Sequence, residues 1–165
     1  MQSRGSRAHV VLATKGAHPE LATMHVPRVS PSEITSDLEA SLRNLQTDCI
    51  DLYWLHRDDP SRPVGEIVET LVSQLKAGKI RAYGFSNWGT SRLREALQYA
   101  TDHALPPLAA NQPLWSLAVP KLEAMADKTL AAMDTEMRQL HRETGLLAVP
   151  YSSQAGGLFQ KIAAG

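Results

Sequence analysis

Short apolar runs alternate along this chain with longer stretches in which apolar residues recur every three or four positions. The short runs predict β-strands at 9–16, 50–56, 80–87, 108–113 and 146–153. Several of these runs are apolar at consecutive positions, as in "LYWL", which is typical of strands that are covered on both faces. The chain therefore contains five predicted strands, and each is followed by a polar loop.

The stretches between the strands have helical spacing. Ser30, Pro31 and Glu33 form a capping box with proline at the first helical position, and they predict the start of the first helix. Further helices are predicted from Pro63 to Gly78, from about 90 to 105, and from 121 to 144, with a short helical start after 153. The apolar stripes of the first three are Ile34, Leu38, Leu42 and Leu45; Ile67, Leu71 and Leu75; and Leu93, Ala96, Leu97 and Ala100.

Alternating strands and helices of these lengths imply an α/β fold with parallel strands and right-handed crossovers. Two architectures satisfy this pattern, an open doubly wound sheet and a (β/α)8 barrel. Periodicity alone does not separate them.

Composition narrows the class of protein. A length of 165 residues suits one domain, and the apolar and charged fractions, 43% and 21%, are those of an ordinary globular chain. The formal net charge of zero argues against a nucleic-acid binder or a binder of anionic membranes. The single cysteine, Cys49, excludes an intramolecular disulfide and a cysteine-based zinc site. No apolar run approaches the roughly 18 residues of a membrane span, and "VVLA" is too short for a signal peptide, so a cytoplasmic location is expected.

Polar or titratable side chains stand at the end of every predicted strand. They are Lys15, His56, Ser86 with Asn87, Asn111 with Gln112, and Tyr151 with Ser152 and Ser153. Any one of them is common loop or surface chemistry, so the argument rests on the set. Because ligands bind at the carboxyl ends of parallel strands in both architectures, these side chains are the candidate site.

Five segments of the sequence contain these strand-end residues and together resemble one protein family. "LATKG", "IDLYWLH", "GKIRAYGFSNW", "NQPLWSL" and "VPYSSQAGGL" resemble the aldo-keto reductase family in order and spacing. The resemblance covers the chain from about Val10 to Gly157. It implies a (β/α)8 barrel, an NADP(H) cofactor, and a small carbonyl or sugar-like substrate.

The resemblance also assigns roles to residues. Lys15 matches the catalytic lysine that lowers the pKa of a tyrosine acid, and His56 matches the catalytic histidine. Ser86, Asn87 and Gln112 match the residues that bind the nicotinamide carboxamide, and Tyr151 matches the aromatic residue on which the nicotinamide ring stacks. Ser152, Ser153, Gly156 and Gly157 match the loop beside the pyrophosphate.

The chain departs from the family pattern in length. Residues 1–165 correspond to the third to seventh βα units of the barrel, so we expect one incomplete domain without the first two strands and the C-terminal unit. A complete barrel needs about 250 residues. The unmatched units carry the family's catalytic aspartate and tyrosine, so this chain alone is expected to be inactive. The truncated sheet would have two open edges and expose inner residues such as Trp54 and Val149, which predicts self-association.

Three functions fit these residues. The chain is an NADP(H)-dependent carbonyl reductase or a piece of one, a nucleotide-binding remnant without the acid, or an interaction protein that kept the fold. Trp88 and Trp115 follow the polar strand ends and are candidates either for packing or for lining a substrate pocket. His18 and His25 have no third ligand at suitable spacing, so no metal site is predicted.

Overall fold

The computed structural model describes residues 6–164, and its centre is one five-stranded sheet. The strands are β1 (Ala13–Gly16), β2 (Leu52–Leu55), β3 (Tyr83–Ser86), β4 (Ala110–Gln112) and β5 (Leu147–Ala148), and every adjacent pair is parallel. Their order in the sheet is their order in the chain. A doubly wound sheet reverses its order at a switch point, whereas a barrel does not. The prediction of a partial (β/α) barrel is confirmed, and the sheet is not closed.

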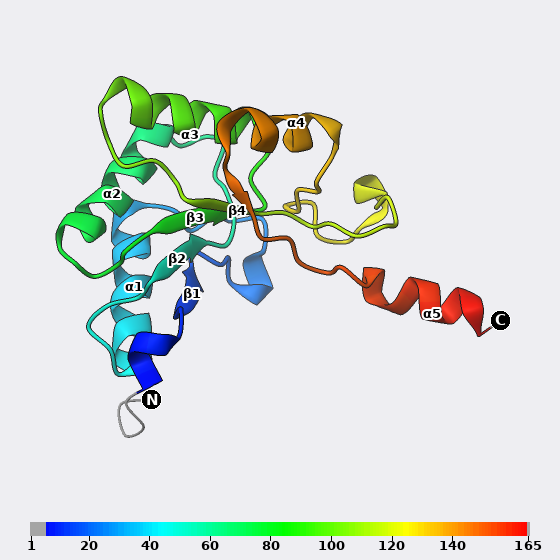
Figure 1. The fold of residues 1–165 in the computed structure, drawn as a ribbon, viewed down its shortest axis with the longest axis horizontal. Helices are drawn as coiled ribbons and strands as arrows, with labels where there is room; N and C mark the ends of the chain where they lie inside the picture. Colours follow the sequence, from blue (N-terminus) through cyan, green and yellow to red (C-terminus); the bar gives the residue numbers. More distant parts are fainter. Residues whose placement is uncertain (1–5, 165) are drawn as a thin grey trace.

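Helices follow the strands in turn. They are α1 (Pro31–Leu45), α2 (Val64–Lys76), α3 (Thr90–Asp102), α4 (Thr135–Thr144) and α5 (Leu158–Ala163). Helices α1 to α4 pack each against the next around the outside of the sheet, while α5 projects away from the rest of the molecule (Figure 1). No helix within residues 6–164 combines the length and the apolar character needed to cross a membrane.

Local capping signals set the helix starts. The Ser30 hydroxyl accepts the Glu33 N–H, and the Glu33 carboxylate accepts the Ser30 N–H at 3.1 Å, so the predicted capping box is present. At α4, the Asp134 carboxylate accepts the Met137 N–H at 2.7 Å.

The predicted helix at 121–144 is too long. Only a short 3₁₀ segment (Leu122–Ala124) and α4 are helical there. The Leu114 N–H donates to the Ala131 carbonyl at 2.9 Å, and the Met133 N–H donates to the Leu114 carbonyl at 2.9 Å. These bonds hold 131–133 beside the end of β4, and a helix cannot begin until Asp134 caps it.

The strands are also shorter than predicted. The first strand, predicted from 9, begins only at Ala13, and His9 instead ends a 3₁₀ turn (Ser6–His9). Arg7 pairs with the Asp51 carboxylate at 2.7 Å, and that carboxylate accepts the Leu12 N–H at 2.8 Å. This contact stabilises the turn, and strand pairing begins only at Ala13.

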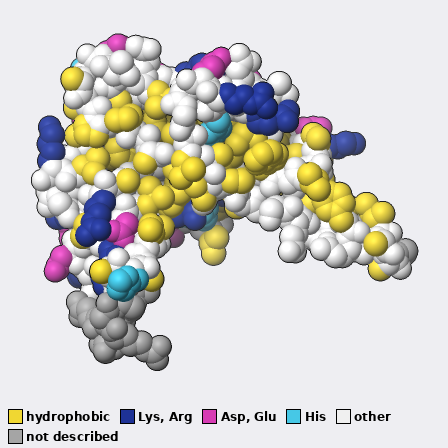
Figure 2. Space-filling model, in the orientation of Figure 1, with side chains coloured by type: hydrophobic (Ala, Val, Ile, Leu, Met, Phe, Trp, Pro, Cys, Tyr) yellow, Lys and Arg dark blue, Asp and Glu magenta, His cyan; other side chains and the backbone are white. Residues whose placement is uncertain are grey.

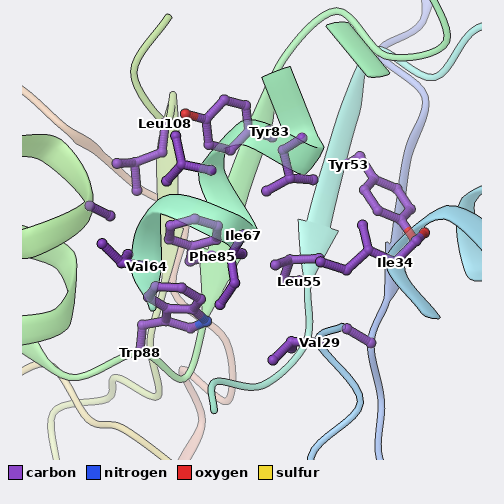
Figure 3. Packing of buried hydrophobic residues seen from close by; sticks show 14 of the residues in the cluster. Val29, Ile34, Tyr53, Leu55, Val64, Ile67, Tyr83, Phe85, Trp88 and Leu108 are labelled. Carbon is purple, nitrogen blue, oxygen red and sulfur yellow. The ribbon is translucent and has the colours of Figure 1, made fainter. Parts of the chain in front are cut away.

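The main core lies between the sheet and the helices. Tyr53 and Phe85, from neighbouring strands, point to the helix side and contact Ile34 of α1 and Ile67 of α2 in one buried cluster (Figure 3). Trp88 lies at the end of this cluster, with its indole stacked on the Phe85 ring at a centroid distance of 3.8 Å.

The opposite face of the sheet is more open. Figure 2 shows hydrophobic side chains gathered across the middle of the molecule and along the projecting C-terminal helix. Leu147 of β5 is 59% exposed, as expected for a sheet that is not closed. The prediction that Trp54 would be exposed is wrong, because only 3% of its surface is accessible. Its ring lies against Gly84 of the adjacent strand, where a Cβ would approach the ring within 2.6 Å.

Candidate active site

The parallel strands bring the predicted side chains to one edge of the sheet. Lys15 is the third residue of β1, His56 directly follows β2, and Ser86 and Gln112 end β3 and β4. Ser86 pairs in register with Gln112, and its hydroxyl donates to the Gln112 carbonyl at 2.9 Å. Tyr151 reaches the same edge through a parallel bridge to Leu114.

Asn87 is the centre of the hydrogen-bond network at this edge. Its backbone has the left-handed conformation, with φ at 59°, which turns the side chain back across the strand ends. Its Nδ2 donates to the His56 carbonyl at 3.3 Å and to the Ser86 hydroxyl at 3.1 Å. Its Oδ1 accepts the Tyr151 hydroxyl at 2.7 Å and the Ala131 N–H at 3.3 Å. One buried carboxamide thus connects the ends of β2 and β3 with Tyr151 and the loop at 113–134.

His56 is half-buried and surrounded by cationic or basic groups. Burial, the adjacent Arg57 guanidinium, His18 and Lys15 together lower the pKa of His56 to about 4, although Asp127 acts in the opposite direction. The His18 ring meets the His56 ring edge-on at a centroid distance of 4.4 Å. His56 is therefore a neutral imidazole at pH 7, with one nitrogen able to donate and one able to accept.

Lys15 belongs to the open face of the sheet. It is paired in register with Trp54, while Tyr53 points to the helices. Partial burial of the ammonium lowers the pKa of Lys15 from its usual value. Tyr53, the tyrosine nearest to Lys15 in the strand register, has no exposed surface and burial raises its pKa, so it is not a proton donor at this edge.

Asn111 and Gln112 face opposite sides of the sheet, because side chains alternate along a strand. Asn111 is fully buried on the helix side, where its Nδ2 contacts Met137 Sδ at 3.3 Å and His141 Nε2 at 3.2 Å. Gln112 faces the site edge, and within residues 6–164 its carboxamide makes no hydrogen bond. Asn111 is thus a packing residue, and Gln112 is free to bind a ligand.

A pocket of about 460 Å³ lies beside the predicted phosphate loop. Ser152 and Gly156 line one side, and the segment 114–125, including Lys121, lines the other. The backbone is left-handed at Ser152, Ala155, Gly156 and Gly157. A Cβ at Gly156 would meet no atom within 4 Å, so the space in front of this turn is open. The small side chains of the turn and the nearby lysine are suited to a phosphate, whereas most of the remaining lining is apolar and includes Leu114, Val119 and Leu158. Ser153 is exposed in the same loop.

The two tryptophans have different surroundings. Trp88 has no exposed surface, and its Nε1 donates to the Arg57 carbonyl at 3.2 Å. The hypothesis that Trp88 lines a substrate pocket does not fit this position, because the indole fills the core between Phe85 and the Arg92 guanidinium. Trp115 is 41% exposed, and its backbone N–H donates to the Tyr151 carbonyl. The Trp115 side chain can therefore border the site.

Two residues of the site were not identified from the sequence. Arg57 received no role from the sequence, although it immediately follows His56, and only 6% of its surface is exposed. His18 was considered only as a metal ligand. Residues 6–164 hold no group of three or more His, Cys, Asp or Glu placed for a metal ion. The position of Arg57 beside a strand-end histidine was the signal available in the sequence.

Known proteins are similar to this chain over the segments that contain these residues. The model of the "Aldo/keto reductase family" matches residues 1–163. The chain is 37% identical to aldo-keto reductase YhdN of Bacillus subtilis over 72% of this chain and 34% of that protein. It is 33% identical to aldo-keto reductase str7 of Strobilurus tenacellus over 96% of this chain and 42% of that protein. The chain therefore spans less than half the length of these curated relatives.

Proposed function

Because the chain belongs to the aldo/keto reductase family, we propose that it forms the cofactor-binding and catalytic edge of an NADP(H)-dependent oxidoreductase. The reaction is hydride transfer between the cofactor and a small carbonyl or alcohol substrate, which includes sugar-like compounds. The observation that supports it most directly is that Lys15, His56, Asn87 and Tyr151 lie at or just beyond the carboxyl ends of four of the five parallel strands. A cytoplasmic location belongs to the same proposal.

Binding of the cofactor is assigned to the part of this edge that the ends of β3, β4 and β5 form. The free carboxamide of Gln112, with Ser86 and Asn87, would hydrogen-bond the nicotinamide carboxamide, and the Tyr151 ring would stack on the nicotinamide. Ser152, Ser153, Gly156 and Gly157 would hold the pyrophosphate at the pocket of about 460 Å³. The bound cofactor would supply the hydride.

Proton transfer is assigned to the side of the edge near β1. A neutral His56 can donate a hydrogen bond that orients and polarises the substrate carbonyl. By the family resemblance, Lys15 lowers the pKa of a tyrosine acid. Three of the four tyrosines within residues 6–164 donate to Ile34, Pro106 and Glu69, away from this edge, and the fourth, Tyr151, donates its hydroxyl to Asn87. We therefore infer that this chain alone binds the cofactor but turns over carbonyl substrates negligibly.

Titration of the 165-residue chain with NADPH, followed by quenching of tryptophan fluorescence, tests this proposal. We expect saturable binding that Gln112→Leu weakens about fivefold, since loss of a hydrogen bond to a ligand typically costs about 1 kcal/mol. Gln98→Leu is the matched control, because Gln98 is exposed on α3 and far from the strand ends in the fold. Absence of saturable binding, or equal affinities for the two variants, would contradict the proposal.

A further inference from the structure

The side chain of Arg57 forms a buried clamp around His56. Its Nη1 contacts His56 Nδ1 at 2.6 Å and donates to the His56 carbonyl at 2.8 Å. Its Nε donates to the Thr129 hydroxyl at 2.7 Å, and its Nη2 donates to the Asp127 carboxylate at 2.8 Å. The side chain is 7% exposed, so these contacts are made largely out of water. Four donors of one guanidinium are thus fixed at once.

The contact between Nη1 and Nδ1 determines where the imidazole proton lies. A guanidinium has five N–H donors and no acceptor, and it does not deprotonate in proteins. The short contact is therefore a hydrogen bond only if Nδ1 accepts. In a neutral imidazole the proton must then be on Nε2. Within the described residues, Nε2 has no hydrogen-bond partner, so this N–H remains available to a ligand.

The partners of Arg57 come from a distant part of the chain. Asp127 and Thr129 lie in the loop between β4 and α4, about 70 residues away in the sequence. Thr129 also donates its hydroxyl to the Asp127 carboxylate at 2.5 Å, and its N–H donates to the same carboxylate at 2.9 Å. These bonds make a rigid pair of acceptors. The same loop contributes Lys121 and Met125 to the pocket beside Ser152.

We propose that Arg57, held by Asp127 and Thr129, is a positioning residue that fixes His56 as the neutral Nε2–H tautomer and presents that N–H to the substrate oxygen. The proposal rests on the role of His56 in the proposed function. Arg57 touches neither substrate nor cofactor, and it acts only through the orientation and proton of His56. Because the clamp depends on the 113–134 loop, that loop becomes part of the catalytic edge and not a simple connection.

The tautomer and titration of His56 test the proposal without cofactor or turnover, so its failure is distinguishable from failure of the proposed function. Long-range ¹H–¹⁵N NMR on the full 165-residue chain, with His56 assigned by its loss in His56→Gln, reports which nitrogen carries the proton. Lys15, His18, Arg57 and Asp127 are the charged or titratable groups that influence this ring. We expect Nδ1 to be unprotonated at pH 7 throughout the wild-type population.

Thr129→Val removes one acceptor of the clamp without changing any charge. We expect it to raise the pKa of His56, with at least a threefold tighter binding of the proton, and to increase the Nδ1–H tautomer. Arg57→Gln should do so more strongly. Thr101→Val is the matched control, because the exposed Thr101 hydroxyl donates to the Leu97 carbonyl of its own helix. A proton on Nδ1 in the wild type would overturn the proposal, even if both clamp variants failed to fold. So would a His56 titration in Thr129→Val that equals that in Thr101→Val.

Discussion

The Tyr151 hydroxyl donates a hydrogen bond of 2.7 Å to Asn87 Oδ1, although 64 positions separate the two residues. In the proposed function, both residues bind the nicotinamide, one through its carboxamide and one through its ring. The bond between them therefore occupies an acceptor that the cofactor would use. Cofactor binding at Asn87 would have to replace this bond.

This competition predicts opposite effects for two substitutions of Tyr151. Tyr151→Phe removes the hydroxyl and keeps the ring, so we expect NADPH affinity to stay equal or to rise by up to about fivefold, the value of one net hydrogen bond of about 1 kcal/mol. Tyr151→Ala removes the stacking surface and should weaken binding. Isothermal titration calorimetry measures both. Tyr99→Phe, which loses a hydroxyl that donates to the Glu69 carboxylate at an exposed position, controls for the loss of the phenol oxygen. Weaker binding by Tyr151→Phe than by the wild type would contradict the competition.

The lowered pKa of His56 predicts a dependence of stability on pH. The unfolded chain has a histidine pKa of about 6.5, whereas the folded value is about 4. Between these values the unfolded state binds a proton that the folded state does not, so the contribution of His56 is complete above pH 6.5 and is lost as pH falls towards 4. The loss is at most about 1.4 kcal/mol per pH unit, and solvent screening of this half-buried ring reduces it.

Urea unfolding at several pH values checks the effect of His56. We expect the stability of His56→Gln to fall less steeply than that of the wild type between pH 6.5 and 4. His103→Gln, which changes an exposed histidine, should follow the wild-type slope. Parallel curves for the wild type and His56→Gln would show that the ring titrates as freely in the folded chain as in the unfolded chain.

The close approach of β2, β3 and β4 at Gly84 predicts a steric effect. A Cβ there would lie 2.6 Å from the Ala110 carbonyl oxygen and 2.6 Å from the Trp54 ring. Because one of these atoms belongs to the backbone, Gly84→Ala should destabilise the chain by about 1–3 kcal/mol. Gly89→Ala is the control, since a Cβ at Gly89 meets no atom within 4 Å, and only a smaller capping cost is expected. Thermal and urea unfolding of the two variants measure the difference, which should be absent if the sheet can spread locally.

The open edges of the sheet predict self-association. Within residues 6–164, strands β1 and β5 each pair on one side only, and Leu147 on β5 is 59% exposed. We expect the apparent mass in sedimentation velocity to rise with concentration, and we expect Leu147→Lys to reduce that rise by placing a charge on the edge. Leu117→Lys changes an even more exposed leucine in the 113–134 loop and should have a smaller effect. A monomer at every concentration would leave the edges without a partner and contradict this prediction.

Structural features that depend on residues close together in the chain were predictable from the sequence. The capping box at Ser30 and Glu33 depends on two residues three positions apart, and it forms as expected. The strand-end positions of Lys15, His56 and Gln112 follow from local apolar patterns, and the parallel order brings them to one edge. Their roles towards a cofactor stay predictions.

Features that depend on distant partners were not predictable in the same way. The long helix predicted from 121 does not form, and α4 begins only at Thr135. Backbone hydrogen bonds between Leu114 and residues Ala131 and Met133 hold the preceding segment beside the end of β4. Arg57 received no role from the sequence, since its acceptors Asp127 and Thr129 lie far away in the chain. Trp54 looked exposed, since only the neighbouring Gly84 provides the space that its ring occupies.

The agreement between strand order and chain order has a consequence for how the polypeptide matures. Each strand pairs with the one synthesised just before it, as Leu52 does with Ala13 and Ala110 does with Gly84. As the chain leaves the ribosome, each of the four later strands of this sheet therefore finds its pairing edge already synthesised. Assembly can proceed from the first unit to the last, and at each step the newest strand is the growing edge.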